Sequence, residues 1–441
     1  MGQHQDQEPV YVHSEEDALE PKHLIRRSDV IIRAGALMLG AGTGSRRVKE
    51  TMRRVGRALD VDALHAQITL NEIVLTISRR GIFRTQVVEI PSPGVNADRV
   101  AALKSWAGSL PDHMTVKAVE AGLDEIVARP SRYSDTMRAL GAGAACAGFA
   151  YLNNGALLEV LAAALAAFAG QFLRISLLHR KLNQLAVVFA ASVLACLCYL
   201  GLSWLGTHLG GLPADRQVAG FTSAVLFLVP GFPLITAALD LARLDLAAGI
   251  SRLTYAALVT VTAAMGTWTV AQVFGLVPTL APPLGTAWWV TLGLRLGATF
   301  LGVFGFAVVF NSPPRPAVAA AVIATVANTP RIYLVEHGLP AQAAAGLATL
   351  LIGVIAWYVG AALGLPRIIL SVPAVVIMVP GAAAYRALVS FNDGDLLASL
   401  DHGISAILVV LGMALGLAAA RMLTDRDWAF VEPRPPTRVT E

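Results

Sequence analysis

The sequence contains two Val-Pro-Gly segments inside long apolar stretches, and a polar solute could bind at both. Pro230 with Gly231, and Pro380 with Gly381, interrupt stretches that otherwise have the composition of helices. Proline lacks a backbone donor and clashes with the preceding turn, so each helix should break there. A break exposes carbonyl groups at one helix end and amide groups at the next, which can hold an ammonium group and a carboxylate. We predict that these four residues bind substrate; the alternative is two kinks that only shape helix packing.

Polar side chains near the breaks are costly in apolar segments and are therefore informative. Asp240 follows the first break, and we predict that it carries a coupling proton; the alternative is a helix-end acid facing Arg243. Thr236 and Arg386 are weaker candidates for substrate contact. Arg295 is a further candidate for holding a carboxylate. For both Arg386 and Arg295, the alternative is a side chain that extends to the membrane surface.

Other polar residues favour structural roles. Asn153, Asn154 and Asn311 stand at segment ends, where helix capping is expected. Asp245 has the context of a loop residue, and Glu159 is expected near the outer surface. The three cysteines lack disulfide or metal-ligand spacing, and no nucleophile accompanies a base. We therefore predict no metal, no cofactor and no enzymatic activity.

The composition is that of a membrane protein with a polar N-terminal third. The 441 residues are 55% hydrophobic and 15% charged, whereas soluble domains average about 25% charged residues. Residues 1–135 hold 36 of the 64 Asp, Glu, Lys and Arg residues, with 18 of each sign. No soluble basic face remains to bind nucleic acid.

Ten apolar segments follow, each predicted to cross the bilayer, which takes about 20 residues. They lie at 136–152, 156–178, 184–206, 217–240, 249–276, 287–311, 316–333, 341–363, 368–390 and 402–423. Lys and Arg gather in alternate loops, which predicts a multi-pass protein of the cell (inner) membrane with both termini cytoplasmic. The expected partners are the lipid bilayer, protons and a small polar substrate; a homo-oligomer is also considered.

The polar third is predicted to form a small cytoplasmic α+β domain. Helices are expected at 25–39, 46–59, 95–110 and 115–128, with strands at 63–69, 73–79 and 84–90. The loop from Gly40 to Ser45 is predicted to be a turn in which Thr43 or Ser45 caps the next helix. The basic face of that helix, from Arg46 to Arg57, would meet either solvent or anionic headgroups.

Three short matches recur in the same order in the two halves of the membrane part. Gly148-Phe149-Ala150 resembles Gly305-Phe306-Ala307, the Val-Pro-Gly segments come next, and Gly249-Ile250-Ser251 resembles Gly403-Ile404-Ser405. An odd number of spans per half predicts inverted repeats of five helices. The predicted organisation is a tail at 1–24, the soluble domain at 25–133, membrane repeats at 134–278 and 286–424, and a tail at 425–441.

Two blocks make the chain resemble the threonine/serine exporter family. One is the run from Leu37 to Glu50, with Gly40-Ala41-Gly42-Thr43-Gly44-Ser45 at its centre; the other is the run from Leu228 to Leu234, followed by Asp240. The resemblance covers residues 25–423 and implies a soluble domain followed by ten spans in two halves. It also implies proton-driven export of threonine and serine, or of dicarboxylates in some relatives.

The leading hypothesis is a secondary active exporter of small polar metabolites, namely threonine and serine, driven by the proton gradient. The alternatives are a succinate-like dicarboxylate exporter and a membrane sensor whose soluble domain binds a ligand. No Walker sequence is present, so direct drive by ATP is not expected.

Overall fold

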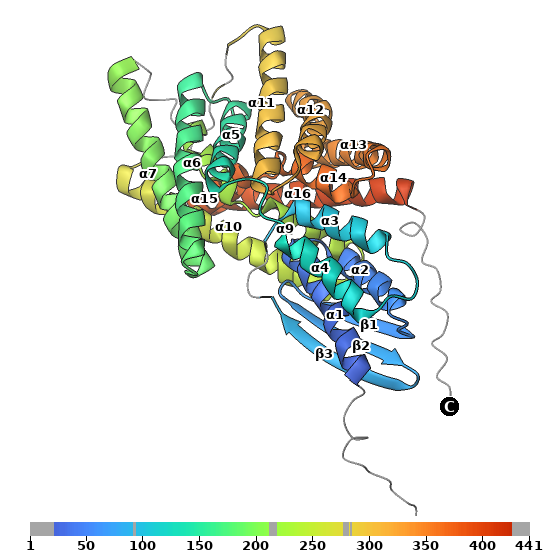
Figure 1. Ribbon diagram of the computed structural model, residues 1–441. Helices are drawn as coiled ribbons and strands as arrows, with labels where there is room; N and C mark the ends of the chain where they lie inside the picture. Colours follow the sequence, from blue (N-terminus) through green and yellow to red (C-terminus); the bar gives the residue numbers. More distant parts are fainter. Residues whose placement is uncertain (1–21, 91–93, 211–217, 277–281, 283–284, 426–441) are drawn as a thin grey trace, which may run out of the picture.

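The computed structural model describes residues 22–425 except 91–93, 211–217, 277–281 and 283–284. The predicted terminal tails therefore lie almost wholly outside the described residues. The first helix begins at Lys22, slightly earlier than the boundary predicted at residue 25. Figure 1 shows an N-terminal α+β part beneath a larger helical part.

The N-terminal part contains α1 (Lys22–Gly40), α2 (Ser45–Ala58), β1 (Ala63–Ile68), β2 (Glu72–Arg79), β3 (Ile82–Glu89), α3 (Ala97–Gly108) and α4 (Val116–Ala128). The predicted order of helices and strands is confirmed, with the ends moved by a few residues. The strands form one antiparallel sheet in the order β1-β2-β3. Whether residues 25–133 fold independently stays a prediction.

Alternation along β2 gives this part its own core. Ile73, Leu75 and Ile77 are fully buried and pack in one cluster with Ile31 and Met52 from the helices. Period-two spacing places the three β2 side chains on one face of the sheet, which is the face that α1 covers. A separate cluster fills the helical part.

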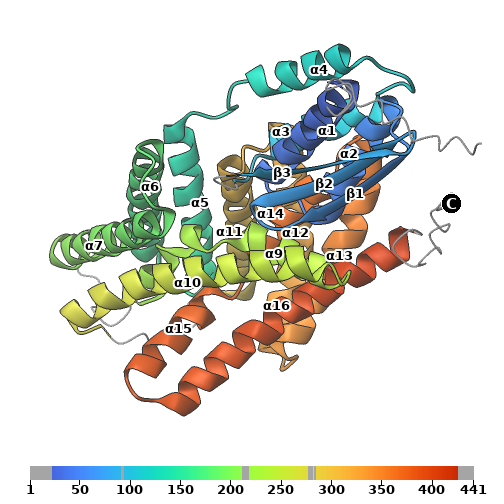
Figure 2. The same cartoon turned by 90° about the horizontal axis from the view of Figure 1, so that it is seen from below.

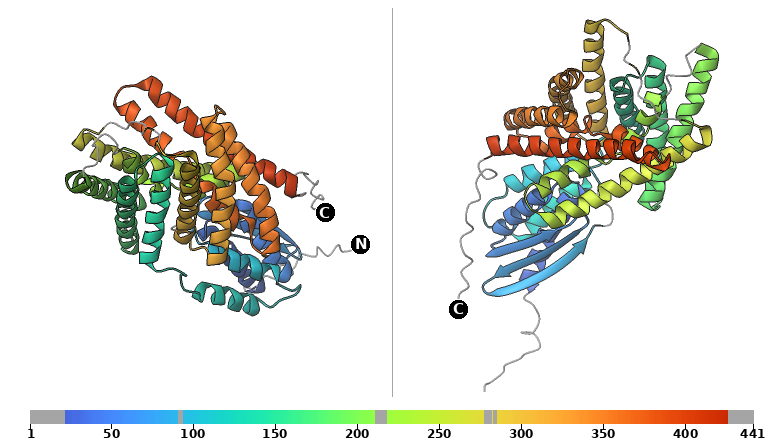
Figure 3. Two further views of the ribbon diagram at one scale, coloured as in Figure 1. Left: turned by 90° about the horizontal axis from the view of Figure 1, so that it is seen from above. Right: turned by 180° about the vertical axis from the view of Figure 1, so that it is seen from behind.

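The helical part contains α5 (Asp135–Leu152), α6 (Leu157–His179), α7 (Gln184–Gly210), α8 (Val218–Ser223), the 3-10 helix η2 (Leu226–Leu228), α9 (Gly231–Leu241), α10 (Leu246–Phe274), α11 (Trp288–Val309), α12 (Pro314–Glu336), α13 (Ala341–Ala362), α14 (Arg367–Val376), α15 (Gly381–Asn392) and α16 (Leu396–Thr424). These helices do not form one parallel bundle. Figures 1 and 3 show α16 crossing the direction of α11.

Within the described residues, seven helices are long and apolar enough to cross a membrane: α6, α7, α10, α11, α12, α13 and α16. Two bent pairs raise the number to nine, with bends of 65° before α9 and 43° between α14 and α15. The predicted count of ten is not confirmed. The expected first span corresponds to α5, which has only 18 residues and carries Asp135 and Arg138 near its start.

The two halves share helix lengths and turns. Helices α6 and α12 each have 23 residues, and α10 and α16 each have 29. The turns that precede α10 and α16 each contain one residue with positive φ, Leu244 (59°) and Gly394 (81°). These features support an internal repeat; that its halves cross the membrane in opposite directions stays a prediction.

The halves meet where α5 packs against α11, through residues that lack side chains. A Cβ atom on Gly148 would lie 2.5 Å from the Ala298 carbonyl oxygen and 2.9 Å from the Gly302 Cα atom. Small residues let two membrane helices approach this closely. Phe149 and Phe306 add an edge-to-face contact at 5.9 Å.

Candidate functional site

Both Val-Pro-Gly segments adopt the same tight turn. Pro230 has φ −79° and ψ 63°, and Pro380 has φ −79° and ψ 52°. In each segment the glycine N–H donates to the valine carbonyl two residues earlier, at 2.8 Å. This geometry is an inverse γ-turn. The helix restarts at the glycine. Each predicted break is therefore confirmed, and it consists of a single γ-turn.

The structure brings the two breaks together. A Cβ atom on Gly231 would lie 3.1 Å from the side chain of Val376, and one on Gly381 would lie 2.6 Å from Leu226. The space left between the breaks has a volume of only about 10 Å³. In this conformation the contact between the breaks is closed, and their role in substrate binding stays a prediction.

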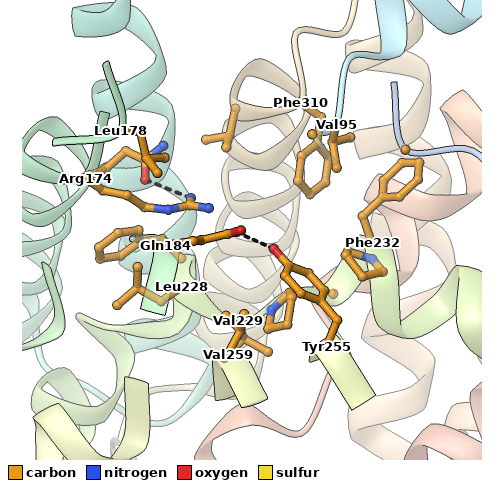
Figure 4. A pocket seen from close by; sticks show the side chains of 18 of the residues that line it. Val95, Arg174, Leu178, Gln184, Leu228, Val229, Phe232, Tyr255, Val259 and Phe310 are labelled. Atoms are coloured by element: carbon orange, nitrogen blue, oxygen red, sulfur yellow. Dashed lines mark hydrogen bonds between the residues drawn. The ribbon is translucent and has the colours of Figure 1, made fainter. Parts of the chain in front are cut away.

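A central cavity of about 840 Å³ lies beside the first break. Pro230, Gly231 and Thr236 line it, together with residues of α6, α7, α10 and α11, whereas Pro380 and Gly381 do not. Leu39 and Val95 of the N-terminal part line it as well. Figure 4 shows the first break, Arg174 and Tyr255 around this space.

The charged residues lining the central cavity are all basic. They are Arg138, Arg174, Lys181 and Arg252, and no described lining residue is Asp or Glu. The Arg174 guanidinium donates to Gln171 at 3.4 Å, while its buried Nε has no hydrogen-bond partner among the described residues. Sequence reasoning took these side chains as signals of orientation. The position of Arg174 within an apolar segment was the available sign of a further role.

Asp240 lies at the end of α9 in a buried cluster that joins the two parts of the molecule. Its carboxylate accepts hydrogen bonds from the Ser45 N–H at 3.2 Å and from the Ser45 hydroxyl at 3.1 Å. Arg252 of α10 places Nη1 3.2 Å from Oδ2 as an ion pair, without the alignment of a hydrogen bond. Both side chains are about 95% buried or more, so each charge is compensated mainly by the other and not by solvent. Arg243, the partner named in the alternative, is not in this ion pair.

Asp245 belongs to the same cluster, although it was expected to be a plain loop residue. It accepts a hydrogen bond from Lys49 at 2.6 Å, and its Oδ2 lies 2.7 Å from the Ser45 hydroxyl, whose single proton is shared between Asp240 and Asp245. Burial raises the pKa of Asp245, but the hydrogen bonds from Lys49 and Ser45 outweigh this and hold the pKa below its ordinary value. An ionised Asp245 therefore ties α2 to the turn before α10.

The cap of α2 differs from the one predicted. The Thr43 hydroxyl donates backwards to the Met38 carbonyl at 3.2 Å, and Ser45 binds Asp240 and Asp245. Gly44 occupies the N-cap position and has no side chain to offer. Asp240 supplies the missing acceptor from another part of the chain, where the positive end of the helix dipole favours an anion.

A second helix N-terminus docks in a similar way. The N–H groups of Ala97 and Asp98, at the start of α3, donate to the carbonyls of Phe310 and Asn311 at 2.9 and 3.2 Å. The Asn311 side chain donates to Asn96 at 3.0 Å. Asn311 therefore connects the end of α11 to the N-terminal part, a role beyond the capping expected from sequence.

Of the other predicted residues, Thr236 lines the central cavity, whereas Arg386 and Arg295 do not. The Thr236 hydroxyl donates to its own helix at Phe232, 3.0 Å away, and the residue is almost fully buried. Arg386 lies on α15 and lines neither the central cavity nor the space between the breaks. Arg295 forms an ion pair with Glu336 in which Nη1 and Oε2 are 2.9 Å apart, so it is not held ready for a substrate carboxylate.

Two asparagines and one acid complete the comparison with the predicted roles. The Asn153 side chain donates to the Phe149 carbonyl at 2.9 Å, which fits its predicted role at the end of α5. Asn154 has φ 66°, which suits the turn that follows α5. Glu159 is buried and accepts the Ala156 N–H at 2.8 Å, so it secures the start of α6; that this end of α6 lies near the outer face of the membrane stays a prediction.

Comparison with known proteins assigns both halves of the chain to one family. Residues 29–274 match the family model of the threonine/serine exporter ThrE, and residues 296–423 match a second model described as "Threonine/Serine exporter, ThrE". No solved structure matches the chain.

Curated relatives match about half of the chain. The "Probable succinate transporter subunit YjjP" of Escherichia coli (strain K12) is 31% identical over 250 residues, which is 56% of this chain and 93% of that protein. The protein of the same name in Klebsiella aerogenes is 29% identical over 253 residues, which is again 56% of this chain and 93% of that protein. An "Uncharacterized protein" of Haemophilus influenzae is 24% identical over 237 residues, which is 46% of this chain and 77% of that protein. With one family model on each half, the chain belongs to the threonine/serine exporter family.

Proposed function

We propose that the protein is a secondary active exporter of small carboxylate-bearing metabolites across the cell membrane, and that it prefers dicarboxylates to threonine and serine. The observation that carries this proposal is the central cavity, whose charged lining consists of four basic residues. A cation in a partly buried site attracts carboxylates and repels ammonium groups.

A dicarboxylate and a zwitterionic amino acid make different demands on such a site. A dicarboxylate needs two sets of cationic donors, which Arg174 and Arg252 can provide from α6 and α10. An amino acid also needs acceptors for its ammonium group, and no carboxylate is among the described lining residues. The name given to the Escherichia coli relative supports the dicarboxylate.

Threonine and serine remain the second candidate, because the family description names them. Backbone carbonyls at the first break could accept hydrogen bonds from the ammonium group of an amino acid. The sensor hypothesis has less support, because a cavity that reaches a broken membrane helix is typical of transport.

Proton coupling is proposed to act through Asp240. Its partner Arg252 also lies in the wall of the central cavity, so the charge state of the carboxylate affects the electrostatics of that wall. Protonation of Asp240 would remove the countercharge of Arg252 and leave that guanidinium to attract a substrate carboxylate. Proton and substrate would thereby be linked through one arginine.

The test is export of labelled succinate, threonine and serine from preloaded cells that express the protein or its variants. Arg174→Gln should lower succinate export roughly tenfold, because one charge-assisted hydrogen bond is lost. Arg180→Gln is the matched control, since Arg180 is exposed in the next turn and does not line the cavity. Faster export of threonine than of succinate, unchanged in Arg174→Gln, would contradict the dicarboxylate proposal.

A further inference from the structure

A second cavity, the basic chamber, lies where α2 and α3 face the helical part. Its volume is about 510 Å³, and residues of α9, α13, α14 and α16 form its opposite wall. Thr236 lines both this chamber and the central cavity, so α9 separates the two spaces. The basic residues that line the chamber are Arg46, Arg47, Arg54, Lys104, Arg243, Arg367 and Arg421.

Positive charge exceeds negative charge in the chamber. Seven basic residues face three acidic ones among the described lining residues. Each acid already has a basic neighbour: Asp425 lies 3.4 Å from Arg46, Glu50 lies 2.9 Å from Arg54, and Asp240 pairs with Arg252 outside the chamber. Arg47, Lys104 and Arg367 take no part in these three pairs, and like charges that share one cavity repel each other unless an anion compensates them.

The excess of positive charge affects the pKa values of Arg47 and Lys104. Burial lowers the pKa of Arg47 to about 10; Glu50 opposes the shift, and Arg367 and Arg46 add to it. Burial, followed by the charge of Arg47, also lowers the pKa of Lys104. Arg47 with a pKa of about 10 remains cationic at neutral pH, so an anion between Arg47 and Lys104 would relieve the repulsion.

The opposite wall holds Arg367 in a fixed position. Its Nε donates to the Gly353 carbonyl at 3.1 Å, its Nη2 donates to the Thr424 hydroxyl at 2.8 Å, and the guanidinium lies 5.6 Å from the centre of the Trp357 ring. A guanidinium that is already ordered loses little entropy when it binds an anion. The chamber thus presents ordered arginine from the helical part opposite arginine and lysine from α2 and α3.

We infer that the basic chamber binds a phosphate-bearing anion that bridges α2 to α14 and α16. The planar fork of arginine matches phosphate oxygens, and several cations converging on one space suit a multivalent group. A cavity of this volume accommodates a small metabolite or a lipid headgroup. The anion clamps the N-terminal part onto the helical part, on the side of α9 away from the central cavity.

This inference also revises the expectation for the basic face of α2. That face was expected to meet solvent or the lipid surface. Arg46, Arg47 and Arg54 instead line the chamber, whereas Arg53 and Arg57 of the same helix are exposed. The two groups provide matched positions for a test.

The test measures binding of inorganic pyrophosphate to the purified full-length protein in detergent, by calorimetry and by the shift in Tm. Pyrophosphate should raise Tm, and Arg47→Gln and Lys104→Gln should each weaken its binding roughly tenfold or more. Arg57→Gln removes the same charge from the exposed side of α2 and should leave binding unchanged. The Tm of each variant without ligand shows whether it is folded.

A second arm distinguishes a free anion from a lipid headgroup. If pyrophosphate has no effect but nanodiscs of phosphatidylglycerol raise Tm above nanodiscs of phosphatidylcholine, and Arg47→Gln abolishes the difference, the ligand is a headgroup. Equal pyrophosphate binding by wild type and Arg47→Gln would overturn the inference, as would no effect from either source. Succinate binding as tightly as pyrophosphate in the chamber would overturn the assignment to phosphate. Because binding and Tm are measured without transport, failure of this inference can be distinguished from failure of the proposed export function.

Discussion

At the scale of single residues, substitution of Asp240 or Arg252 is expected to reduce stability most. Each is almost fully buried, and each is the other's main compensation for the cost of burying a charge. Ser45 extends this pair to the N-terminal part, so one carboxylate takes part in docking, in the electrostatics of the central cavity and in the proposed coupling.

Replacing Asp240 by Asn should therefore reduce stability as well as export. The change leaves the Arg252 guanidinium buried without a countercharge, at a cost of about 3–5 kcal/mol. We expect a lower Tm for the detergent-purified variant and loss of export after its membrane insertion has been verified.

The double variant Asp240→Asn with Arg252→Gln separates these effects. Removing both charges should restore much of the lost Tm, because no unpaired charge remains. Export should stay low, because both the proposed proton carrier and a cavity cation are missing. Proton-dependent export by the double variant would remove Asp240 from the coupling role.

Asp245 leads to a prediction about pH. Its pKa is held below the ordinary value, so its ion pair stabilises the fold at pH values above the unfolded-state pKa of about 3.9, and this contribution is lost as the pH falls through the lower folded-state pKa. Asp245→Asn should thus lower Tm at pH 6, and the difference from wild type should shrink towards pH 3. A difference in Tm that is constant across this range would contradict the assignment.

Sequence reasoning at this scale found Asp240 but not its surroundings. A carboxyl in an apolar segment is conspicuous because burying it is costly. Its partner Ser45 is 195 residues away, and nothing local in Gly40-Ala41-Gly42-Thr43-Gly44-Ser45 reveals that the helix cap comes from α9. Arg174 and Arg252 were missed because basic residues near segment ends also report orientation.

At the scale of elements, the two breaks are the feature that sequence predicted best. Proline dictates an interruption, and the identical Val-Pro-Gly segments give nearly identical turns. The position of α5 was also predicted, but its spanning character was not confirmed. Helix α5 has 18 residues with two charges near its start. Whether such a helix crosses the membrane depends on the helices packed beside it, which the sequence does not reveal.

A large side chain in place of Gly231 or Gly381 should disrupt the packing of the two breaks and slow export. A side chain at Gly231 meets Val376, and one at Gly381 meets Leu226, so leucine at either position forces the two turns apart. Overpacking of this kind costs about 1–3 kcal/mol. We expect Gly231→Leu and Gly381→Leu to insert in the membrane but to export succinate far more slowly than wild type.

Gly297→Leu is the matched control for these variants. Gly297 lies on α11, and a Cβ atom there would meet nothing within 4 Å. Export close to wild type in this variant would show that leucine in a membrane helix is tolerated in itself. Normal export by both break variants would remove the breaks from the transport site.

At the scale of the whole molecule, the N-terminal part is attached by more than the chain itself. The N-termini of α2 and α3 dock on α9 and α11, and Arg46 lies 3.4 Å from Asp425 beyond the end of α16. Figure 2 shows this part against one side of the helices. No local pattern in the sequence predicts such docking, because several of its donors are main-chain amides and its side-chain partners are far apart along the chain.

The match to the relatives suggests how the whole molecule divides. The Escherichia coli relative, named as a subunit, aligns over 93% of its own length with only 56% of this chain, and the second family model begins at residue 296. Contacts between α5 and α11, and between the two breaks, hold the halves together independently of the connecting loop. The loop should therefore be dispensable.

Expressed together as two polypeptides, residues 1–282 and 283–441 should associate in the membrane and restore export, as measured by co-purification through a tag on one half and by succinate release. Gly148→Leu should disrupt the split pair more than the intact chain, because its Cβ atom would lie 2.5 Å from the Ala298 carbonyl of the other half and the chain no longer tethers the two. Gly201→Leu, where a Cβ atom meets nothing within 4 Å, is the control. Two halves that insert but neither co-purify nor export would show that the loop is required, and that contacts across α5 and α11 are too weak to assemble the transporter.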